Sequence, residues 1–178
     1  MEHKGLRGGA AVLVGLSASV AVAATAVAGA TVLRFADGLK DYSSAAAGPF
    51  DHATARLQLV DRATATTAVL HVRGVDPAVA GRTFGAHLHD GPCSSDAPAA
   101  ASGHYNADAH AGHVPVVVSR QTEVWLDFTV DASGAGDSST AVRFPVEPGA
   151  RSVVVHAAPT DPATGLAGAR LACLPVEW

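Results

Sequence analysis

The chain has 178 residues, a hydrophobic fraction of 48% and a formal net charge of −4. This length is typical of one domain that buries a hydrophobic core of its own. The 12 Lys and Arg residues are outnumbered by 16 Asp and Glu residues and form no basic stripe, which argues against nucleic acid as a partner.

The N-terminus is basic and then apolar. Lys4 and Arg7 precede the stretch 8–33, which is rich in Ala, Val and Leu and carries no charge. A basic start, an apolar run and small-residue sites such as Ala26-Val27-Ala28 are typical of a secretory signal peptide. The run is also long enough for a single membrane anchor with the rest of the chain outside, and a buried core helix is a third interpretation. We expect residues 1–34 to be an apolar export helix, so that the protein is secreted or anchored on the outer face of the cytoplasmic membrane.

The next segment, 35–51, is polar and rich in Gly, Ser and Ala, which predicts a linker to a folded domain over 52–178. In that domain the turn residues Gly, Pro, Asp and Ser separate short apolar runs. Many short strands with regular turns predict an all-β antiparallel sandwich or Greek-key barrel. The predicted strands are Thr54–Val60, Thr67–Arg73, Phe84–His89, Glu123–Val130, Thr140–Val146, Ser152–His156 and Ala169–Val176, with a further candidate at Val114–Val118.

Four of the nine histidines form a candidate metal site. Residues two apart in a strand point to the same side, so His87 and His89 project together. His104 lies in a glycine-containing loop, and His156 ends an apolar strand at the expected rim of the sandwich. Neutral imidazoles from three segments predict the all-nitrogen site that copper favours.

The only two cysteines, Cys93 and Cys173, are far apart in the sequence. In an exported chain such a pair predicts one disulfide bond. Two buried free thiols are the alternative.

The same motifs resemble, in the same order, those of the copper/zinc superoxide dismutase family of the bacterial exported type. Gly85-Ala86-His87-Leu88-His89 resembles the Gly-x-His-x-His strand of the family. Gly103-His104-Tyr105-Asn106 resembles the loop whose histidine bridges the two metals. Val153–His156 resembles the last copper-ligand strand, and Gly168–Cys173 resembles the C-terminal signature. The resemblance covers roughly residues 54–176.

The resemblance implies a Greek-key β-barrel or sandwich and the disproportionation of superoxide to oxygen and hydrogen peroxide. It implies copper ligands at His87, His89, His104 and His156. Arg170 would lie beside the metal and attract the superoxide anion, and His104 would be a catalytic residue as well as a ligand. The Cys93–Cys173 disulfide would tie the metal-site loop to the strand that carries Arg170.

The zinc half departs from the family pattern. His110-Ala111-Gly112-His113 stands where the family has a His-x-x-Asp pair, and a further family histidine between His104 and this segment is missing. His104, His110 and His113 would hold zinc with Asp108 or water as a fourth ligand. The alternative is that His110 and His113 are solvated loop residues and that the site takes copper alone.

Two other functions compete with the enzyme. A copper-binding protein that buffers or delivers the metal would fit the altered zinc region, whereas Arg170 favours the enzyme because storage needs no anion guide. A metal-free structural sandwich conflicts with four copper-type histidines.

The loop Ala157–Leu166 is short, and Asp161 is its only acidic candidate for orienting the metal-bound histidines. No motif selects an oligomeric state.

Overall fold

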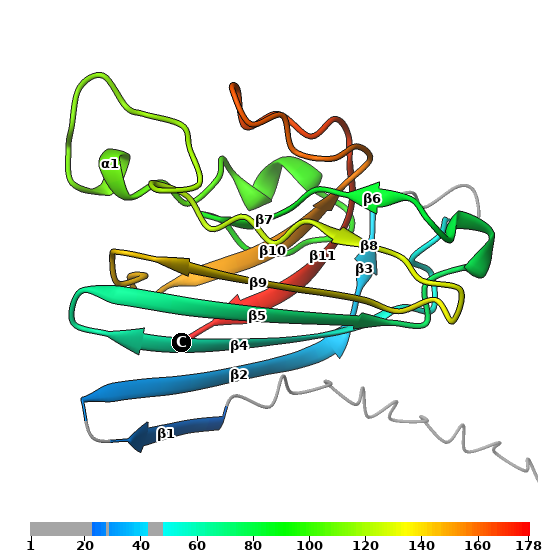
Figure 1. The fold of residues 1–178 in the computed structure, drawn as a ribbon, viewed down its shortest axis with the longest axis horizontal. Coiled ribbons are helices and arrows are strands. Elements are labelled where there is room, and N and C mark those ends of the chain that lie inside the picture. Colours follow the sequence, from blue (N-terminus) through cyan, green and yellow to red (C-terminus); the bar gives the residue numbers. More distant parts are fainter. Residues whose placement is uncertain (1–22, 28, 43–47) are drawn as a thin grey trace, which may run out of the picture.

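A computed structural model describes residues 23–27, 29–42 and 48–178, which form two antiparallel sheets and a small ribbon (Figure 1). The five-stranded sheet has the order β1 (Ala23–Val27), β2 (Ala30–Gly38), β4 (Thr54–Arg62), β5 (Ala65–Arg73) and β9 (Gly136–Val142). The four-stranded sheet has the order β3 (Lys40–Asp41), β11 (Arg170–Glu177), β10 (Ala150–His156) and β7 (Ala86–His89). The ribbon pairs β6 (Thr83–Phe84) with β8 (Phe128–Thr129), and the helices are η1 (Pro77–Val79), η2 (Pro98–Ala101) and α1 (Ala107–His110). The predicted all-β antiparallel architecture is confirmed.

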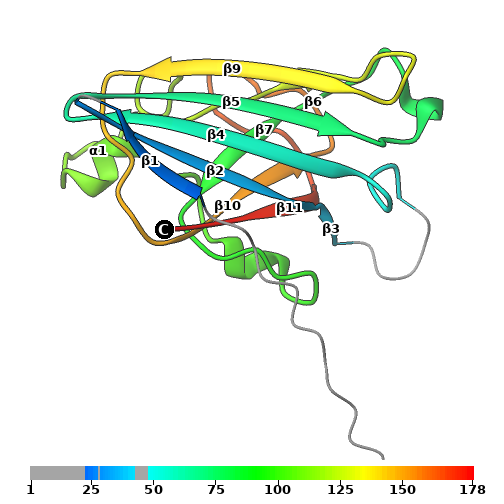
Figure 2. The same cartoon turned by 90° about the horizontal axis from the view of Figure 1, so that it is seen from below.

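The core lies between the two sheets, which Figure 2 shows from below as separate layers. Strand β4 illustrates why, because Ala55, Leu57 and Leu59 are buried, while Arg56 is exposed and Gln58 is half-buried. This alternation places apolar side chains on one face of the strand. They pack in one cluster with Val153 and Leu174 of the other sheet. Burying a side chain of this size stabilises the fold by about 1.5–3 kcal/mol.

The folded domain begins earlier than the sequence predicts. Strand β2 pairs with β4 from Thr31 opposite Asp61 to Gly38 opposite Thr54, and Phe35 in its middle is 1% exposed. The segment 35–51, predicted as a linker, therefore supplies part of a central strand. Buried and exposed residues alternate over only a few positions of β2. Because the neighbouring sequence is rich in alanine and glycine, this alternation is too short to be recognised as a strand.

The predicted export helix lies mostly outside the described residues, which begin at position 23. Its C-terminal part is described, and it forms β1 and the start of β2, paired from Ala23 opposite Arg34 to Val27 opposite Ala30. Among the residues that the structure describes, no helix is long and apolar enough to cross a membrane.

Four predicted strands differ from the structure. Thr140–Val146 begins and ends four residues after the observed β9, and Phe84–His89 is divided at Gly85 between β6 and β7. Of the stretch 123–130 only Phe128–Thr129 is a strand, while Glu123 and Trp125 form isolated bridge pairs with Asn106 and His87. The candidate strand Val114–Val118 is an exposed loop, with Val114 94% exposed. An apolar run forms a strand only where a neighbouring strand accepts its hydrogen bonds.

The four-stranded sheet brings the histidine segments together. Strands β7 and β10 are antiparallel neighbours, with His87 opposite Val154 and His89 opposite Ser152. The pairing of β10 with β11 shifts register between Val155 and His156, at the end of β10. His104 forms an isolated bridge pair with His89. One end of this sheet therefore collects histidines from three segments of the chain.

Candidate metal centre

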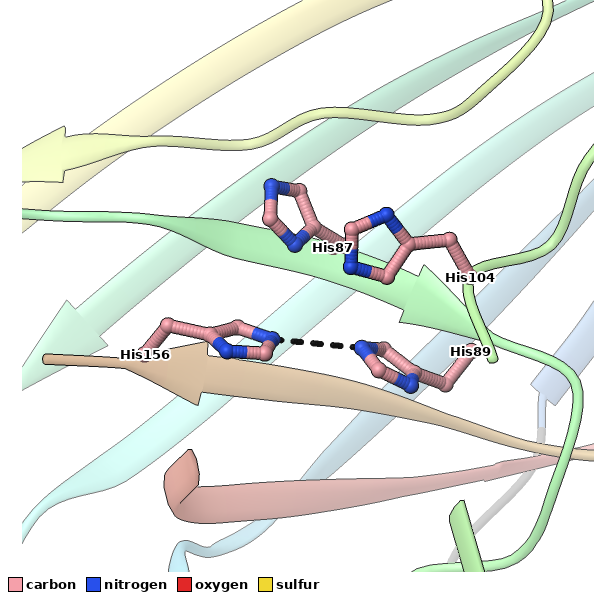
Figure 3. A group of neighbouring side chains, drawn as sticks. All are labelled: His87, His89, His104 and His156. Carbon is pink, nitrogen blue, oxygen red and sulfur yellow. Dashed lines mark hydrogen bonds between the residues drawn. The ribbon is translucent and has the colours of Figure 1, made fainter. Parts of the chain in front are cut away.

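Four imidazoles converge at this end of the sheet (Figure 3). They belong to His87 and His89 of β7, His104 of the loop after η2, and His156 of β10. One ligand nitrogen from each ring lies within 4.8 Å of the others. The rings of β7 and β10 are buried, whereas the His104 side chain is 18% exposed. The four predicted copper ligands are thus brought together with one ring open to solvent.

Two of these rings point bare nitrogens at each other. His89 Nδ1 lies 3.2 Å from the Ser102 carbonyl oxygen, and His156 Nδ1 lies 3.2 Å from that of Gly168. A carbonyl oxygen only accepts, so both Nδ1 atoms carry the hydrogen and both Nε2 atoms carry a lone pair. The two Nε2 atoms are 3.2 Å apart, the contact that is dashed in Figure 3. A hydrogen bond there would need a hydrogen on one of them, whereas the two carbonyl contacts place both hydrogens on Nδ1.

Two lone pairs that face each other repel, so the pair of His89 and His156 needs a positive charge between the rings. Burial is the main cause that lowers the pKa of His89 to about 3 and that of His156 to about 4, and the nearby His104 lowers both further. Near neutral pH neither ring holds a second proton. A metal ion is the species that satisfies both lone pairs.

The third ring, His87, is oriented through a threonine. Its Nε2 lies 2.6 Å from Thr160 Oγ1, and that hydroxyl donates to Asp127 Oδ1 at 2.6 Å. The hydroxyl hydrogen is committed to the carboxylate, so Thr160 accepts the Nε2 hydrogen of His87. This leaves His87 Nδ1 bare, buried and without a hydrogen-bond partner. Burial and the neighbouring histidines hold the pKa of His87 far below its ordinary value.

The fourth ring, His104, is oriented by a buried carboxylate. His104 Nδ1 lies 2.8 Å from Glu123 Oε2, which also accepts from Trp125 Nε1 at 2.7 Å, while Glu123 Oε1 accepts from Asn106 Nδ2 at 3.1 Å. Burial raises the pKa of Glu123, but the hydrogen bonds from His104, Trp125 and Asn106 outweigh it and lower the pKa. The carboxylate is therefore ionised and holds the hydrogen on His104 Nδ1. The bare atom of this ring is Nε2.

The donor set is thus three Nε2 atoms and one Nδ1 atom, each fixed by a hydrogen bond on its other nitrogen. Such outer contacts are typical of metal-binding histidines. The orphaned His87 Nδ1 and the two facing Nε2 atoms show that the residues fit a metal ion. Neutral imidazoles suit copper or zinc.

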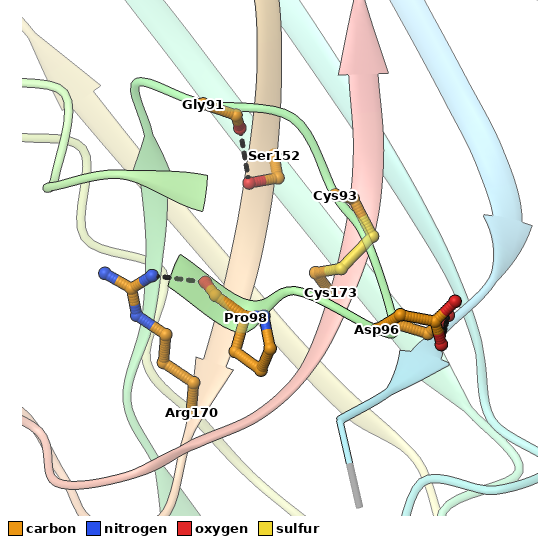
Figure 4. The surroundings of a disulfide bond; sticks show 8 residues. Gly91, Cys93, Asp96, Pro98, Ser152, Arg170 and Cys173 are labelled. Carbon is orange, nitrogen blue, oxygen red and sulfur yellow. Dashed lines mark hydrogen bonds between the residues drawn. A yellow bond between two sulfur atoms is a disulfide. The ribbon is translucent and has the colours of Figure 1, made fainter. Parts of the chain in front are cut away.

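Arg170 lies on the His89 side of the cluster, and Figure 4 shows it beside Pro98 and near the disulfide. Its guanidinium donates to the Pro98 carbonyl at 2.5 Å and to the Ser102 carbonyl, which also accepts from His89. The Cys93–Cys173 disulfide has a Cα–Cα distance of 5.6 Å. It joins the loop that holds Pro98 to the strand that carries Arg170, as predicted.

Of the four predicted zinc ligands, the structure brings only His113 and Asp108 into contact. His104 Nδ1, the nitrogen that would face zinc, binds Glu123 instead. His110 lies between Asp90 and Glu147, at 2.9 and 3.1 Å. His113 is an exposed side chain that pairs with Asp108 at 3.1 Å. The four copper-type histidines are the only metal-ligand group of three or more His, Cys, Asp or Glu found in the described residues.

Sequence reasoning missed three residues that orient the rings. Glu123 and Asp127 are the two charges of the apolar run 123–130, and each is two residues from Trp125. In an extended segment all three share one side, which is a usable signal. Thr160 has no such signal, since it lies 33 positions from Asp127 and meets it only in the fold. Asp161, the expected candidate, instead accepts from the backbone of Ala163 and Thr164 in its own turn.

No protein-family model matches this chain, and no curated protein matches it.

Proposed function

We propose that this protein is an exported superoxide dismutase that works with copper alone and resembles the copper/zinc superoxide dismutase family. The observation that carries the proposal is the convergence of four imidazoles whose tautomers are all fixed so that one bare nitrogen of each faces the others. Copper suits a set of nitrogen ligands that includes one partly exposed ring. Within this proposal the two sheets form the Greek-key sandwich of that family.

Copper in this site would supply the one-electron chemistry, taking an electron from one superoxide ion and giving it to a second, which with two protons yields oxygen and hydrogen peroxide. Arg170 is permanently cationic and attracts the anion to the His89 side. His104 is the ring that solvent reaches, and Glu123 keeps the hydrogen on its Nδ1. His104 is therefore the ligand ring that a small anion, and the water that supplies its protons, can reach.

Glu123 supports the copper-only form of the proposal. In the two-metal arrangement that the sequence resemblance implies, the bridging histidine uses both nitrogens on metals. Here the outer nitrogen of His104 donates to a carboxylate 2.8 Å away. Glu123 carries the negative charge that orients the ring, and a second metal has no role in doing so.

Export is also part of the proposal. The disulfide is compatible with an exported protein. Because β1 begins at Ala23, only positions 8–22 of the apolar run precede the sheet. A transmembrane helix needs about 20 apolar residues, so this length favours a signal peptide over an anchor.

The proposal is tested by loading the full chain with copper alone and measuring superoxide dismutation beside two variants. The His156→Ala variant loses one of the four ligands and is expected to lose the activity. The matched His113→Ala variant removes an exposed histidine outside the cluster and is expected to keep it. Stoichiometric copper binding without dismutation would overturn the enzyme and leave a copper-binding protein on the same scaffold.

A further inference from the structure

Arg120 lies one aromatic ring away from the metal-binding histidines. Its guanidinium carbon is 5.2 Å from the centre of a Trp125 ring, in cation–π contact. The same tryptophan lies 6.0 Å, between ring centres, from His87. The guanidinium is therefore within about 11 Å of the His87 ring, comparable with the Debye length of about 8–10 Å in physiological salt.

The charge of Arg120 has no carboxylate partner. The side chain is exposed, and in the described part of the chain no hydrogen bond or ion pair joins it to an acidic residue. The loop 157–169, which borders the cluster through Thr160 and Gly168, contains no Lys or Arg. Arg120 and Arg170 are thus two cations on different sides, the first towards His87 and the second towards His89.

The two arginines balance the two carboxylates that orient the rings. Glu123 holds His104, and Asp127 holds His87 through Thr160. With both arginines present these four charges cancel, and the charge of a bound metal ion remains to attract anions. Without Arg120 the same groups carry a net negative charge that opposes an approaching anion.

We propose that Arg120, whose charge lies behind Trp125 and the buried His87, attracts small anions to the metal and so complements Arg170. This rests on the proposed function and names a second residue that selects its substrate by charge. The positive charge of Arg120 also contributes to the lowered pKa of His87, so its electric field extends to the histidine cluster. Trp125 keeps the guanidinium in place while leaving its charge unpaired.

The test is the affinity of the copper(II)-loaded full chain for azide, a small anion whose binding to copper is followed by absorbance. A unit charge about 10 Å away in a mostly aqueous medium changes the affinity for a monoanion about two- to four-fold. Arg120→Gln should therefore raise the azide dissociation constant two- to four-fold, and Arg120→Glu about four- to ten-fold. Both effects should shrink in 0.5 M salt (about 4 Å Debye length).

Arg56→Gln is the matched control, because Arg56 is exposed on the five-stranded sheet and takes no part in the histidine cluster. It should leave the azide constant unchanged. Unchanged azide affinity in both Arg120 variants would overturn the proposal, and so would an equal loss at low and high salt. A wild-type protein that binds azide in an Arg120-dependent way but does not dismute superoxide would overturn the proposed enzyme and keep Arg120 as an anion guide.

Discussion

The Nε2 atoms of His89 and His156 face each other at 3.2 Å, and both are bare because each ring donates its Nδ1 hydrogen to a backbone carbonyl. Two lone pairs at this distance repel each other in the metal-free protein. The fold holds them there because both rings are buried and their strands are neighbours. This repulsion lowers the free energy of unfolding of the metal-free protein. Binding of a metal ion removes the repulsion and raises the free energy of unfolding.

The metal-free protein should lose stability on acidification. The folded pKa values of His89 and His156, about 3 and 4, lie below the unfolded value of about 6.5. Between these values the unfolded chain binds protons that the fold does not, so stability falls as the pH drops below about 6.5. His87, whose pKa is held lower still, contributes to the same fall. The slope is at most about 1.4 kcal/mol per pH unit for each histidine.

Denaturant unfolding of the metal-free protein from pH 7.5 to 4 measures this slope. A His156→Gln variant should show a shallower slope, because one of the three buried histidines no longer titrates. Identical slopes in wild type and variant would show that His156 is not the group responsible.

The four rings should show two tautomers. His87 is expected to carry its hydrogen on Nε2, because Thr160 accepts there, and the other three rings are expected to carry it on Nδ1. Nitrogen-15 NMR of the metal-free protein at pH 7.5 distinguishes the two forms by the chemical shifts of the ring nitrogens. A Nδ1–H form of His87 would contradict the assigned bare Nδ1.

Replacing Glu123 by Gln should weaken the metal site. The carboxylate accepts from His104 and Trp125 on one oxygen and from Asn106 on the other. In glutamine an NH2 group replaces one of these oxygens, so it would face a partner that is itself a hydrogen-bond donor. We expect a 10- to 100-fold loss of copper affinity and a loss of about 1–3 kcal/mol in stability.

Competition with a copper chelator and denaturant unfolding give the two quantities. Glu147→Gln is the control, since Glu147 is an exposed carboxylate that contacts His110 outside the cluster. Equal losses in the two variants would contradict a special role for Glu123.

Thr160→Val should release the His87 ring while preserving the shape of the side chain. The His87 Nε2 hydrogen then has no acceptor at 2.6 Å, so the tautomer with a bare Nδ1 is no longer favoured. Copper affinity should fall about 10-fold, the lower end of the usual range for outer contacts. The control is Thr129→Val, which removes a hydroxyl that hydrogen-bonds to Thr83 outside the cluster. Chelator competition on both variants makes the comparison.

Removing the Cys93–Cys173 bond should destabilise the fold. The bond closes a loop of 80 residues, for which the chain-entropy model gives about 4–5 kcal/mol. The bond also anchors the loop whose Pro98 carbonyl binds Arg170. A Cys93→Ser, Cys173→Ser double variant should therefore unfold at lower denaturant and bind azide more weakly when loaded with copper(II). An unchanged unfolding midpoint would contradict this prediction.

The sequence by itself determined the parts of the site that depend on local periodicity. The spacing of His87 and His89 in an apolar strand puts both rings on one side, and His156 ends a strand that is recognisable without its partners. The same periodicity predicts β4 and β5. It fails for β2, because this strand begins inside the apolar run that predicts an export segment. It also fails for Val114–Val118, an apolar run with no strand to pair with.

Only the tertiary structure decided which nitrogen of each ring is bare and which residue orients it. Thr160 meets Asp127 across 33 positions, and Glu123 reaches His104 across 19, because the loops that carry them pack at the same end of the sheet. Hydrogen bonds between side chains depend on distances of a few tenths of an ångström, which no local pattern encodes. For the same reason the spacing of His110 and His113 suggested zinc, although the fold turns both towards carboxylates outside the cluster.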